Sequence, residues 1–427
     1  LTVSTLTGGF TGVIEPAFPS TRQFRSIPFA EPPVGSRRWL PPQKLSASDG
    51  HRWSTKFPPS CPQFVSGVDI FWNSNLTKGN LIYNGAQNDT SGLIGEATSE
   101  DCLQLAVWTP TIENIPAEGL PVLFFMTGGG FVMGGVELPW QIPVSWVDRS
   151  KSHIVVSINY RVSIFGFPGA RGLSDQNLGI LDQRVALEWV RDNIAAFGGD
   201  PDRITHWGRS AGAISADIHT YAYYDDPVAQ AYYIESGTVF SGGGVPAPTF
   251  SNFSFVAQHV GCASPCGSQA CNAEDYAAAE LDCMRQVSPI QIINFIGQYA
   301  DRGQAPPLAF GLSADERIVF SDYAARSEAG LIARRPTMIS YTANEFSSLV
   351  PWPVNLTEGP DQALVTAGTV TFGVCATYNS TAYRNQLSPD VPVYRFQYAA
   401  EFPNLNVYDW LGAYHNSETP LIFGAYD

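Results

Sequence analysis

The most constraining feature of this chain is a Gly-x-Ser-x-Gly sequence, Gly208–Gly212, between an apolar strand-like segment and a helix-like segment. A serine at a sharp strand-to-helix turn sits in a strained backbone conformation, and glycines leave the room that this turn needs. A chance match in a glycine-rich chain is the alternative, and the flanking strand and helix argue against it. The pattern therefore predicts that Ser210 is a nucleophile held above a sheet edge.

Apolar segments alternate with an amphipathic segment along the chain. Because strand, helix and strand follow one another, the order predicts an α/β fold with a large, mostly parallel sheet and helices on both faces. Residues 1–427 are read as one catalytic domain, and the proline-rich stretch Phe24–Gly35 as an extended surface segment. The irregular middle, Tyr221–Gly330, is expected to pack over the catalytic edge and to line the pocket. The expected strands are Leu103–Trp108, Pro121–Met126, His153–Tyr160, Pro336–Tyr341 and Val391–Tyr398, with a helix over Asn177–Ala196.

Charge and hydropathy exclude some classes of partner. The 427 residues carry a formal net charge of -15, which argues against nucleic acid and anionic membrane surfaces, since phosphates would be repelled. No apolar run approaches the ~20 residues of a membrane span. The chain lacks an initiator Met and a signal-like start, so we expect a mature, processed chain. Nothing in the sequence indicates the oligomeric state.

Cysteines and glycosylation sequons point to secretion. None of the seven cysteines lies in a Cys-x-x-Cys pair or at zinc-finger spacing from a histidine, so no metal site is predicted. Cysteines together with five Asn-x-Ser/Thr sequons favour an extracellular protein with disulfides and N-linked glycans. The sequons begin at Asn75, Asn88, Asn252, Asn355 and Asn379.

A serine nucleophile needs a base and an acid that orients the base. The order expected along such a chain is serine, acid, histidine. His415 follows a strand near the end of the chain, where the base belongs, whereas His259 lies in a helical stretch. Glu345 directly follows an apolar strand at the carboxyl edge of the sheet, whereas the rival acids at positions 315 and 316 precede their strand.

A run of three glycines, Gly128–Gly130, follows another apolar strand and is the candidate oxyanion hole. Backbone N–H groups approach a substrate oxygen closely only where side chains are absent. A phosphate-binding loop is the alternative, but the run has neither the Walker lysine nor the dinucleotide spacing.

With these residues in place, the chain resembles the type-B carboxylesterase/lipase family, the cholinesterase-like branch of the α/β-hydrolase fold, and in particular its secreted fungal-type members. The resemblance runs from about Thr7 to Gly424. The blocks that carry it are Ile27–Gly35, Ser99–Leu103, Gly128–Phe131, Ser157–Arg161, Asn177–Gln183, Phe197–Pro201 and the turn at Ser210.

The resemblance implies roles for individual residues. It implies a catalytic triad of Ser210, Glu345 and His415, with Ser236 supporting the acid and the histidine. The implied oxyanion donors are Gly129, Gly130 and Ala211. The implied disulfides are Cys61–Cys102 and Cys262–Cys283, with Cys266–Cys271 as an added local pair and Cys375 left odd.

Four departures from the family pattern stand out. Thr127 replaces the usual histidine before the glycines, and we expect it to tune the site. Arg209 replaces the usual glutamate before the serine, and we expect the cation to favour anionic or polar acyl groups. Phe346 follows the acid where the family has glycine. The chain ends at Asp427, about a hundred residues short of usual members, so we expect it to lack the family's C-terminal tail.

These observations predict a serine carboxylesterase that forms an acyl-enzyme and needs no cofactor. Two alternatives stay open. One is a triacylglycerol lipase whose lid lies in the Cys61–Cys102 loop, where Val68–Trp72 is apolar. Sequons in that loop argue against contact with a lipid surface. The other is a cholinesterase-like adhesion protein that keeps the fold without catalysis.

Overall fold

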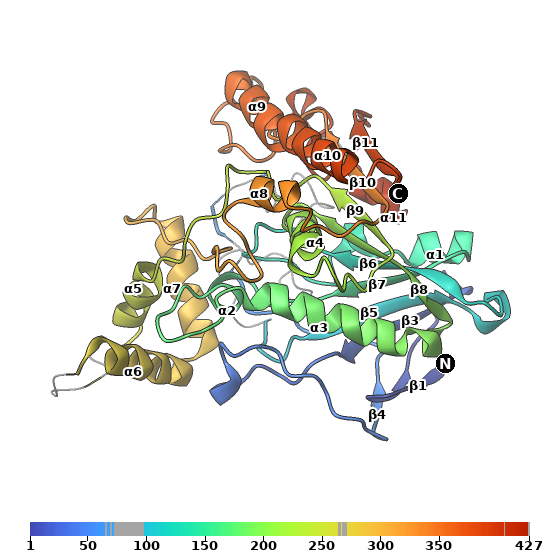
Figure 1. The fold of residues 1–427 in the computed structure, drawn as a ribbon, viewed down its shortest axis with the longest axis horizontal. Helices are drawn as coiled ribbons and strands as arrows, with labels where there is room; N and C mark the ends of the chain where they lie inside the picture. The colour runs from blue at the N-terminus through green and yellow to red at the C-terminus, as the bar shows by residue number, and fades with distance from the viewer. Residues whose placement is uncertain are drawn as a thin grey trace.

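One eight-stranded sheet forms the centre of the molecule, with the strand order β11-β10-β9-β8-β6-β7-β5-β3 (Figure 1). The structure is a computed structural model that describes residues 1–64, 66–68, 71, 98–263, 266, 271–404 and 406–425. The strands of the sheet are β3 (Thr21–Pro28), β5 (Gln104–Pro110), β6 (Leu120–Met126), β7 (Ile154–Ile158), β8 (Gly199–Arg209), β9 (Ala231–Glu235), β10 (Thr337–Thr342) and β11 (Val393–Tyr398).

The sheet is parallel from β7 to β11, and β5 and β3 complete it as antiparallel strands at one end. Each of the five expected strands is present, with ends that differ from the predicted ones by at most two residues. The carboxyl ends of the parallel strands meet at one edge, so the turns after β6, β8 and β10 lie near one another.

Helices cover both faces of the sheet, and alternate side chains of each strand point to different helices. Phe124 of β6 packs in the core with Ala186 of α3 and Ala213 of α4. Phe125, next to it in β6, instead packs against Phe423 of α11, on the other face. The helices are α1 (Val144–Ser150), α2 (Ser163–Gly166), α3 (Leu178–Asn193), α4 (Ala211–Ala222), α5 (Ser251–His259), α6 (Ala273–Gln286), α7 (Pro289–Asp301), α8 (Tyr323–Glu328), α9 (Gln362–Gly368), α10 (Ala376–Leu387) and α11 (Thr419–Phe423).

The N-terminal part corrects one expectation. Strands β1 (Thr2–Thr5), β2 (Gly8–Thr11) and β4 (His51–Trp53) form a small separate sheet. The stretch expected as a surface segment instead begins in β3, where Phe24 and Ile27 are fully buried. Strand β3 tolerates its terminal proline because it is an edge strand with a register shift between Phe24 and Ile27. No helix within the described ranges is long and apolar enough to span a membrane.

Three disulfide bonds are present, and they are the pairs that the resemblance implies. They join Cys61–Cys102, Cys262–Cys283 and Cys266–Cys271. The second of these ties the segment after α5 to α6, within the group of helices α5, α6 and α7 that projects from one side of the sheet (Figure 1). Cys375 is an exposed free thiol.

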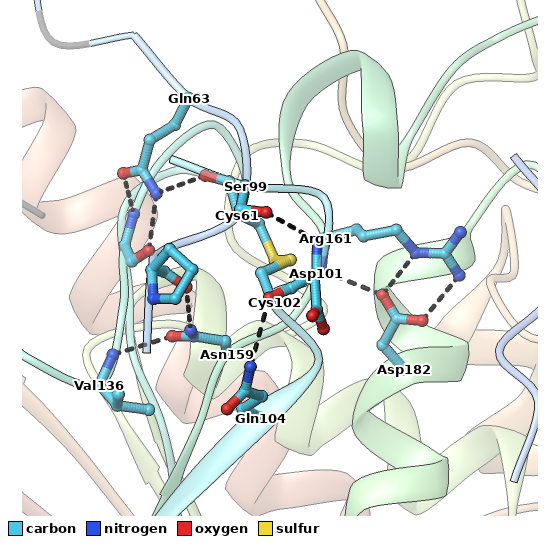
Figure 2. The surroundings of a disulfide bond; sticks show 12 residues. Cys61, Gln63, Ser99, Asp101, Cys102, Gln104, Val136, Asn159, Arg161 and Asp182 are labelled. Atoms are coloured by element: carbon cyan, nitrogen blue, oxygen red, sulfur yellow. Dashed lines mark hydrogen bonds and ion pairs between the residues drawn. A yellow bond between two sulfur atoms is a disulfide. The ribbon is translucent and has the colours of Figure 1, made fainter. Parts of the chain in front are cut away.

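The first disulfide fixes the loops next to the turn after β6 (Figure 2). The Gln63 side chain hydrogen-bonds the backbone of Gly134 through both its amide atoms, at 2.9 Å each. The Asn159 amide oxygen accepts from the Val136 N–H at 3.0 Å, and its nitrogen donates to a carbonyl of the segment before Cys61. These contacts hold the loop that carries the glycine run in one conformation.

Candidate active site

The turn at Ser210 has the geometry that the glycines predict. Strand β8 ends at Arg209 and α4 begins at Ala211, which leaves Ser210 alone in the turn at φ 55° and ψ -122°. A Cβ on Gly208 would lie 2.0 Å from the Gly212 carbonyl oxygen, and one on Gly212 would lie 2.1 Å from that of Met126. No side chain fits at either position, so both glycines are needed for the strained serine conformation.

His415 and Glu345 form a close pair beside this turn. The Nδ1 atom of His415 lies 2.5 Å from Glu345 Oε2, and both side chains are almost fully buried. The other carboxylate oxygen accepts from the Thr342 N–H at 2.8 Å. These two contacts fix the carboxylate and, through it, the orientation of the imidazole ring.

Electrostatics keep the Glu345 carboxyl ionised. Burial alone would raise its pKa, but the positive charge that His415 can carry and the hydrogen bonds to the carboxylate lower the pKa below its usual value. The buried Ser236 hydroxyl lies beside the carboxylate and contributes to this lowering, although its geometry falls outside strict hydrogen-bond limits. Ser236 therefore lies where the resemblance places it.

The loop that carries His415 is held to the sheet at two points. Asn344, next to Glu345, forms a parallel bridge with Tyr414, next to His415. The Ser347 hydroxyl donates to the Leu411 carbonyl at 2.6 Å. The acid and the histidine are thus joined through backbone contacts as well as through their side chains.

Two residues of the glycine run line the same cavity as His415. Gly129 and Gly130 have φ values of +117° and +61°, and a Cβ on Gly129 would lie 2.2 Å from the Met133 carbonyl oxygen. Both glycines line the same cavity as Ser210, as does Ala211, the first residue of α4. The three residues therefore share one cavity with Ser210.

The cavity has a volume of about 400 Å³ and a mainly apolar wall. Phe372, on a π-helical segment (Thr369–Cys375), contacts the His415 ring at 6.1 Å between centroids. The residues that line the cavity are Gly129, Gly130, Phe131, Val132, Met133, Arg209, Ser210, Ala211, Ile214, Leu349, Phe372 and His415.

The irregular middle of the chain contributes to a neighbouring cavity and not to this one. A second cavity of about 150 Å³ shares Phe131 and Ile214 with the first, and its remaining wall includes Val245 and Leu312. The expectation that residues 221–330 line the main pocket is therefore wrong for the cavity at Ser210. The wall of the cavity at Ser210 instead comes from the turns after β6 and β8, the start of α4 and the segments that carry Leu349, Phe372 and His415.

Thr127 and Arg209 occupy different environments. Thr127 is buried, and its carbonyl accepts from the Tyr160 hydroxyl at 2.9 Å, so its backbone anchors the start of the glycine run. Arg209 is only 3% exposed, yet it lines the cavity. Its Nε is buried without a hydrogen-bond partner, and the described carboxylates form no ion pair with it.

Two buried glutamates near Arg209 were not predicted from the sequence as part of the site. Glu235 is the in-register neighbour of Arg209 on β9, and Glu418 precedes α11 three residues after His415. Both are almost fully buried, and their carboxyl groups lie within hydrogen-bonding reach of each other. Burial raises the pKa of both carboxyl groups, and the charge of Glu418 raises that of Glu235 further, while the charge of Glu345 raises that of Glu418. A charged residue that ends an apolar strand, as Glu235 does, was the available signal.

Other predicted sites are placed as follows. Asn355 and Asn379 are exposed, and Asn252 is half-buried with its amide nitrogen bonded to the Ala309 carbonyl. Asn75 and Asn88 lie outside the described residues, as does most of Val68–Trp72. Within the described ranges, no three histidine, cysteine or acidic side chains gather as metal ligands would.

Comparison with known proteins places these features in a family. A sequence profile of the carboxylesterase family matches residues 1–362. A chlorogenic acid esterase of Aspergillus niger is 36% identical over 436 residues, which cover 100% of this chain and 77% of that protein. Secreted lipase 5 of Gibberella zeae is 34% identical over 453 residues, which cover 100% of this chain and 80% of that protein. Secreted lipase 1 of Botryotinia fuckeliana is 36% identical over 68% of this chain and 49% of its own length.

Proposed function

This chain belongs to the carboxylesterase family of α/β-hydrolases and is a serine ester hydrolase, and we propose that Ser210, Glu345 and His415 are its catalytic triad. The observation that carries the proposal is the convergence of Ser210, the Glu345–His415 pair and the glycine run on one cavity. Residues 1–427 act as a single catalytic domain, because one sheet takes strands from both ends of the chain.

The reaction follows from the position of each group. His415 takes the proton of the Ser210 hydroxyl as the oxygen attacks the ester carbonyl, while ionised Glu345 orients the imidazole and stabilises its charge. The N–H groups of Gly129, Gly130 and Ala211 bind the oxyanion of the tetrahedral intermediate. His415 then protonates the leaving alcohol, and water releases the acid from Ser210 by the same steps. His415 carries each proton transfer in this cycle, whereas the backbone N–H groups stabilise the oxyanion through hydrogen bonds.

A short-chain or aromatic carboxylic ester fits the main cavity best. The cavity of about 400 Å³ is mainly apolar, and its wall includes Phe131 and Phe372. One relative is named for chlorogenic acid, which makes that ester a useful test substrate. Names of the relatives and three disulfides support action outside the cell, with glycans at the exposed sequons Asn355 and Asn379.

Hydrolysis of 4-nitrophenyl esters over a range of acyl lengths tests the proposal, with Ser210→Ala as the matched variant. We expect turnover that is greatest for short acyl chains and falls by about 10⁴–10⁶ in Ser210→Ala, because no other described residue that lines the cavity has a hydroxyl or thiol side chain. Unchanged turnover in a folded Ser210→Ala protein would contradict the assignment of the nucleophile.

Triacylglycerol hydrolysis is the second candidate, because two of the compared relatives are named as lipases. The neighbouring cavity shares Phe131 and Ile214 with the first, which extends the apolar wall. A maximum at long acyl chains, with a rise in rate above the solubility limit of tributyrin, would favour the lipase over the esterase.

A further inference from the structure

Six arginines of the described chain are buried to more than nine-tenths, and five of them share one property. Each of the five donates side-chain hydrogen bonds to carboxylates or carbonyls of the protein. They are Arg22 with Pro110, Arg38 with Glu100, Arg161 with Asp182, Arg184 with Glu188 and Arg384 with Asp217.

Arg209 is the exception among these arginines. Its Nε is buried without an acceptor, as is that of Arg384, but Arg384 still donates through its other guanidinium nitrogens to Asp217. Among the described residues, no side-chain hydrogen bond or ion pair involves Arg209. An arginine cannot lose its proton at ordinary pH, so a buried guanidinium without acceptors carries an uncompensated cost. A buried donor group that the protein leaves unsatisfied next to a cavity is suited to a ligand.

The guanidinium lies at the reacting centre. Arg209 directly precedes Ser210 and lines the cavity with it. A Cβ on Gly128 would lie 3.1 Å from Arg209 Nη2 and 2.8 Å from Ser210 Cβ, which places the guanidinium against the start of the glycine run. A substrate ester bound above Ser210 is therefore within reach of this cation.

The two glutamates beneath Arg209 keep it charged without occupying its donors. Glu235 and Glu418 both act on Arg209 through their charge, and the Trp207 indole N–H donates to Glu235 Oε2 at 2.7 Å. The pair balances the charge of Arg209 from a distance, and an oxygen acceptor in the cavity would complete its hydrogen bonds.

We propose that Arg209 is a substrate-recognition residue, which binds a carboxylate carried by the ester substrate in the cavity beside Ser210. Planar carboxylates match the paired donors of a guanidinium, and such charge-assisted hydrogen bonds are among the strongest in proteins. The inference rests on the proposed ester hydrolysis at Ser210 and narrows its substrates to esters with an acidic group. The carboxylate can belong to the acyl part or to the alcohol part.

Two substrate pairs separate these sources. For the acyl part, the 4-nitrophenyl monoester of glutaric acid is compared with the same ester in which the free carboxyl is a carboxamide. For the alcohol part, the butyrate ester of 3-hydroxypropanoic acid is compared with that of 3-hydroxypropanamide. We expect wild-type kcat/KM to favour the carboxylate by about 10–100-fold in one pair, and Arg209→Gln to lose most of that preference.

A matched variant controls for net charge. Arg302→Gln removes one positive charge from an exposed position at the end of α7, away from the cavity. It should keep the wild-type preference for the carboxylate ester. An equal preference for both esters in the wild type, an unchanged preference in Arg209→Gln, or an equal loss in Arg302→Gln would each overturn the proposal.

Further variants keep the test valid if Arg209→Gln does not fold. The double variant Arg209→Gln with Glu235→Gln restores the charge balance of the buried cluster, and Arg209→Lys keeps the charge but loses the planar fork. We expect the double variant to lose the preference and the lysine variant to keep part of it. Hydrolysis of the neutral esters that depends on Ser210 would show that the proposed function stands even where the preference is absent.

Discussion

Arg161 and Arg209 are both buried arginines, but their surroundings differ in the hydrogen bonds that they offer. Arg161, after β7, donates to both carboxylate oxygens of Asp182 on α3, at 2.7 and 2.8 Å (Figure 2). Arg209, at the end of β8, is as deeply buried but leaves its Nε without an acceptor beside a cavity. The first arrangement joins a loop to a helix, whereas the second leaves donors for a molecule that enters the site.

The difference separates polar groups that stabilise the fold from polar groups that are available to a ligand. A complete ion pair has nothing left to offer a ligand, so its loss affects the folded state. A buried guanidinium without acceptors raises the free energy of the empty site. A substrate that supplies an acceptor removes this cost and therefore binds more tightly. We therefore expect changes near Arg209 and the triad to alter catalysis, and changes near Arg161 to alter stability.

The largest effect should come from the triad. In Glu345→Gln the side chain keeps its size but loses the charge that holds His415 in position, and we expect kcat to fall by about 10³–10⁴. The melting temperature should change little by comparison. Steady-state hydrolysis of 4-nitrophenyl butyrate and thermal unfolding of the same preparation measure both. A variant with near wild-type kcat would remove Glu345 from the triad and weaken the contrast between the two regions.

The second effect belongs to the region of Arg161. Asp182→Asn leaves a buried guanidinium without its carboxylate, which should cost about 3–5 kcal/mol in the free energy of unfolding. Molecules that remain folded should keep their kcat, because neither residue lines the cavity. Urea unfolding measures the loss, with Asp192→Asn on the exposed side of the same helix as the control. A variant of wild-type stability and low kcat would reverse the assignment of the two regions.

The smallest effect concerns Glu137, a largely buried carboxyl group. Like the guanidinium of Arg209, it is an ionisable group that burial disfavours in its charged form. Burial raises the pKa of Glu137 to about 7, whereas the unfolded chain keeps it near 4.5. Below pH 4.5 both states are protonated. Between pH 4.5 and about 7 the unfolded chain ionises while the folded state keeps its proton, so stability falls over this range and the full penalty remains above pH 7. Glu137→Gln removes this penalty.

Because Glu137 is partly exposed, we expect Glu137→Gln to stabilise the protein by only about 1–2 kcal/mol at pH 8, and not at pH 4. Unfolding curves at both pH values provide the measurement, and Glu118→Gln serves as an exposed control. A gain of the same size at both pH values would mean that titration is not its cause. Glu137 can avoid the cost of a buried charge by keeping its proton. Arg209 stays charged, so its lack of hydrogen-bond acceptors has a cost at every ordinary pH.

Local sequence was sufficient to predict the main residues of the candidate site. The glycines around Ser210 and at Gly129 are required by close backbone contacts within a few residues, so their pattern is visible without a fold. Chain order then selected His415 and Glu345, and the structure places the two side chains in contact. Apolar segments predicted the parallel strands because such strands are buried on both faces.

Contacts between distant segments were beyond this reasoning. The sequence identified Arg209 as unusual and suggested an effect on acyl groups, but it did not predict that Glu235 and Glu418 lie near this arginine. Those residues meet Arg209 only because β9 pairs with β8 and α11 covers the same face of the sheet. Likewise, the described wall of the cavity comes from turns, the start of α4 and the π-helical segment, and not from the irregular middle of the chain.

The sequence by itself determined the class of reaction, because a strained serine turn, a glycine run and an ordered acid and histidine each depend on short-range sterics or on chain order. Only the tertiary structure decided how the charge of Arg209 is balanced and which of its donors stay unsatisfied. Burial and pairing are properties of side chains brought together from different strands, and no single segment encodes them.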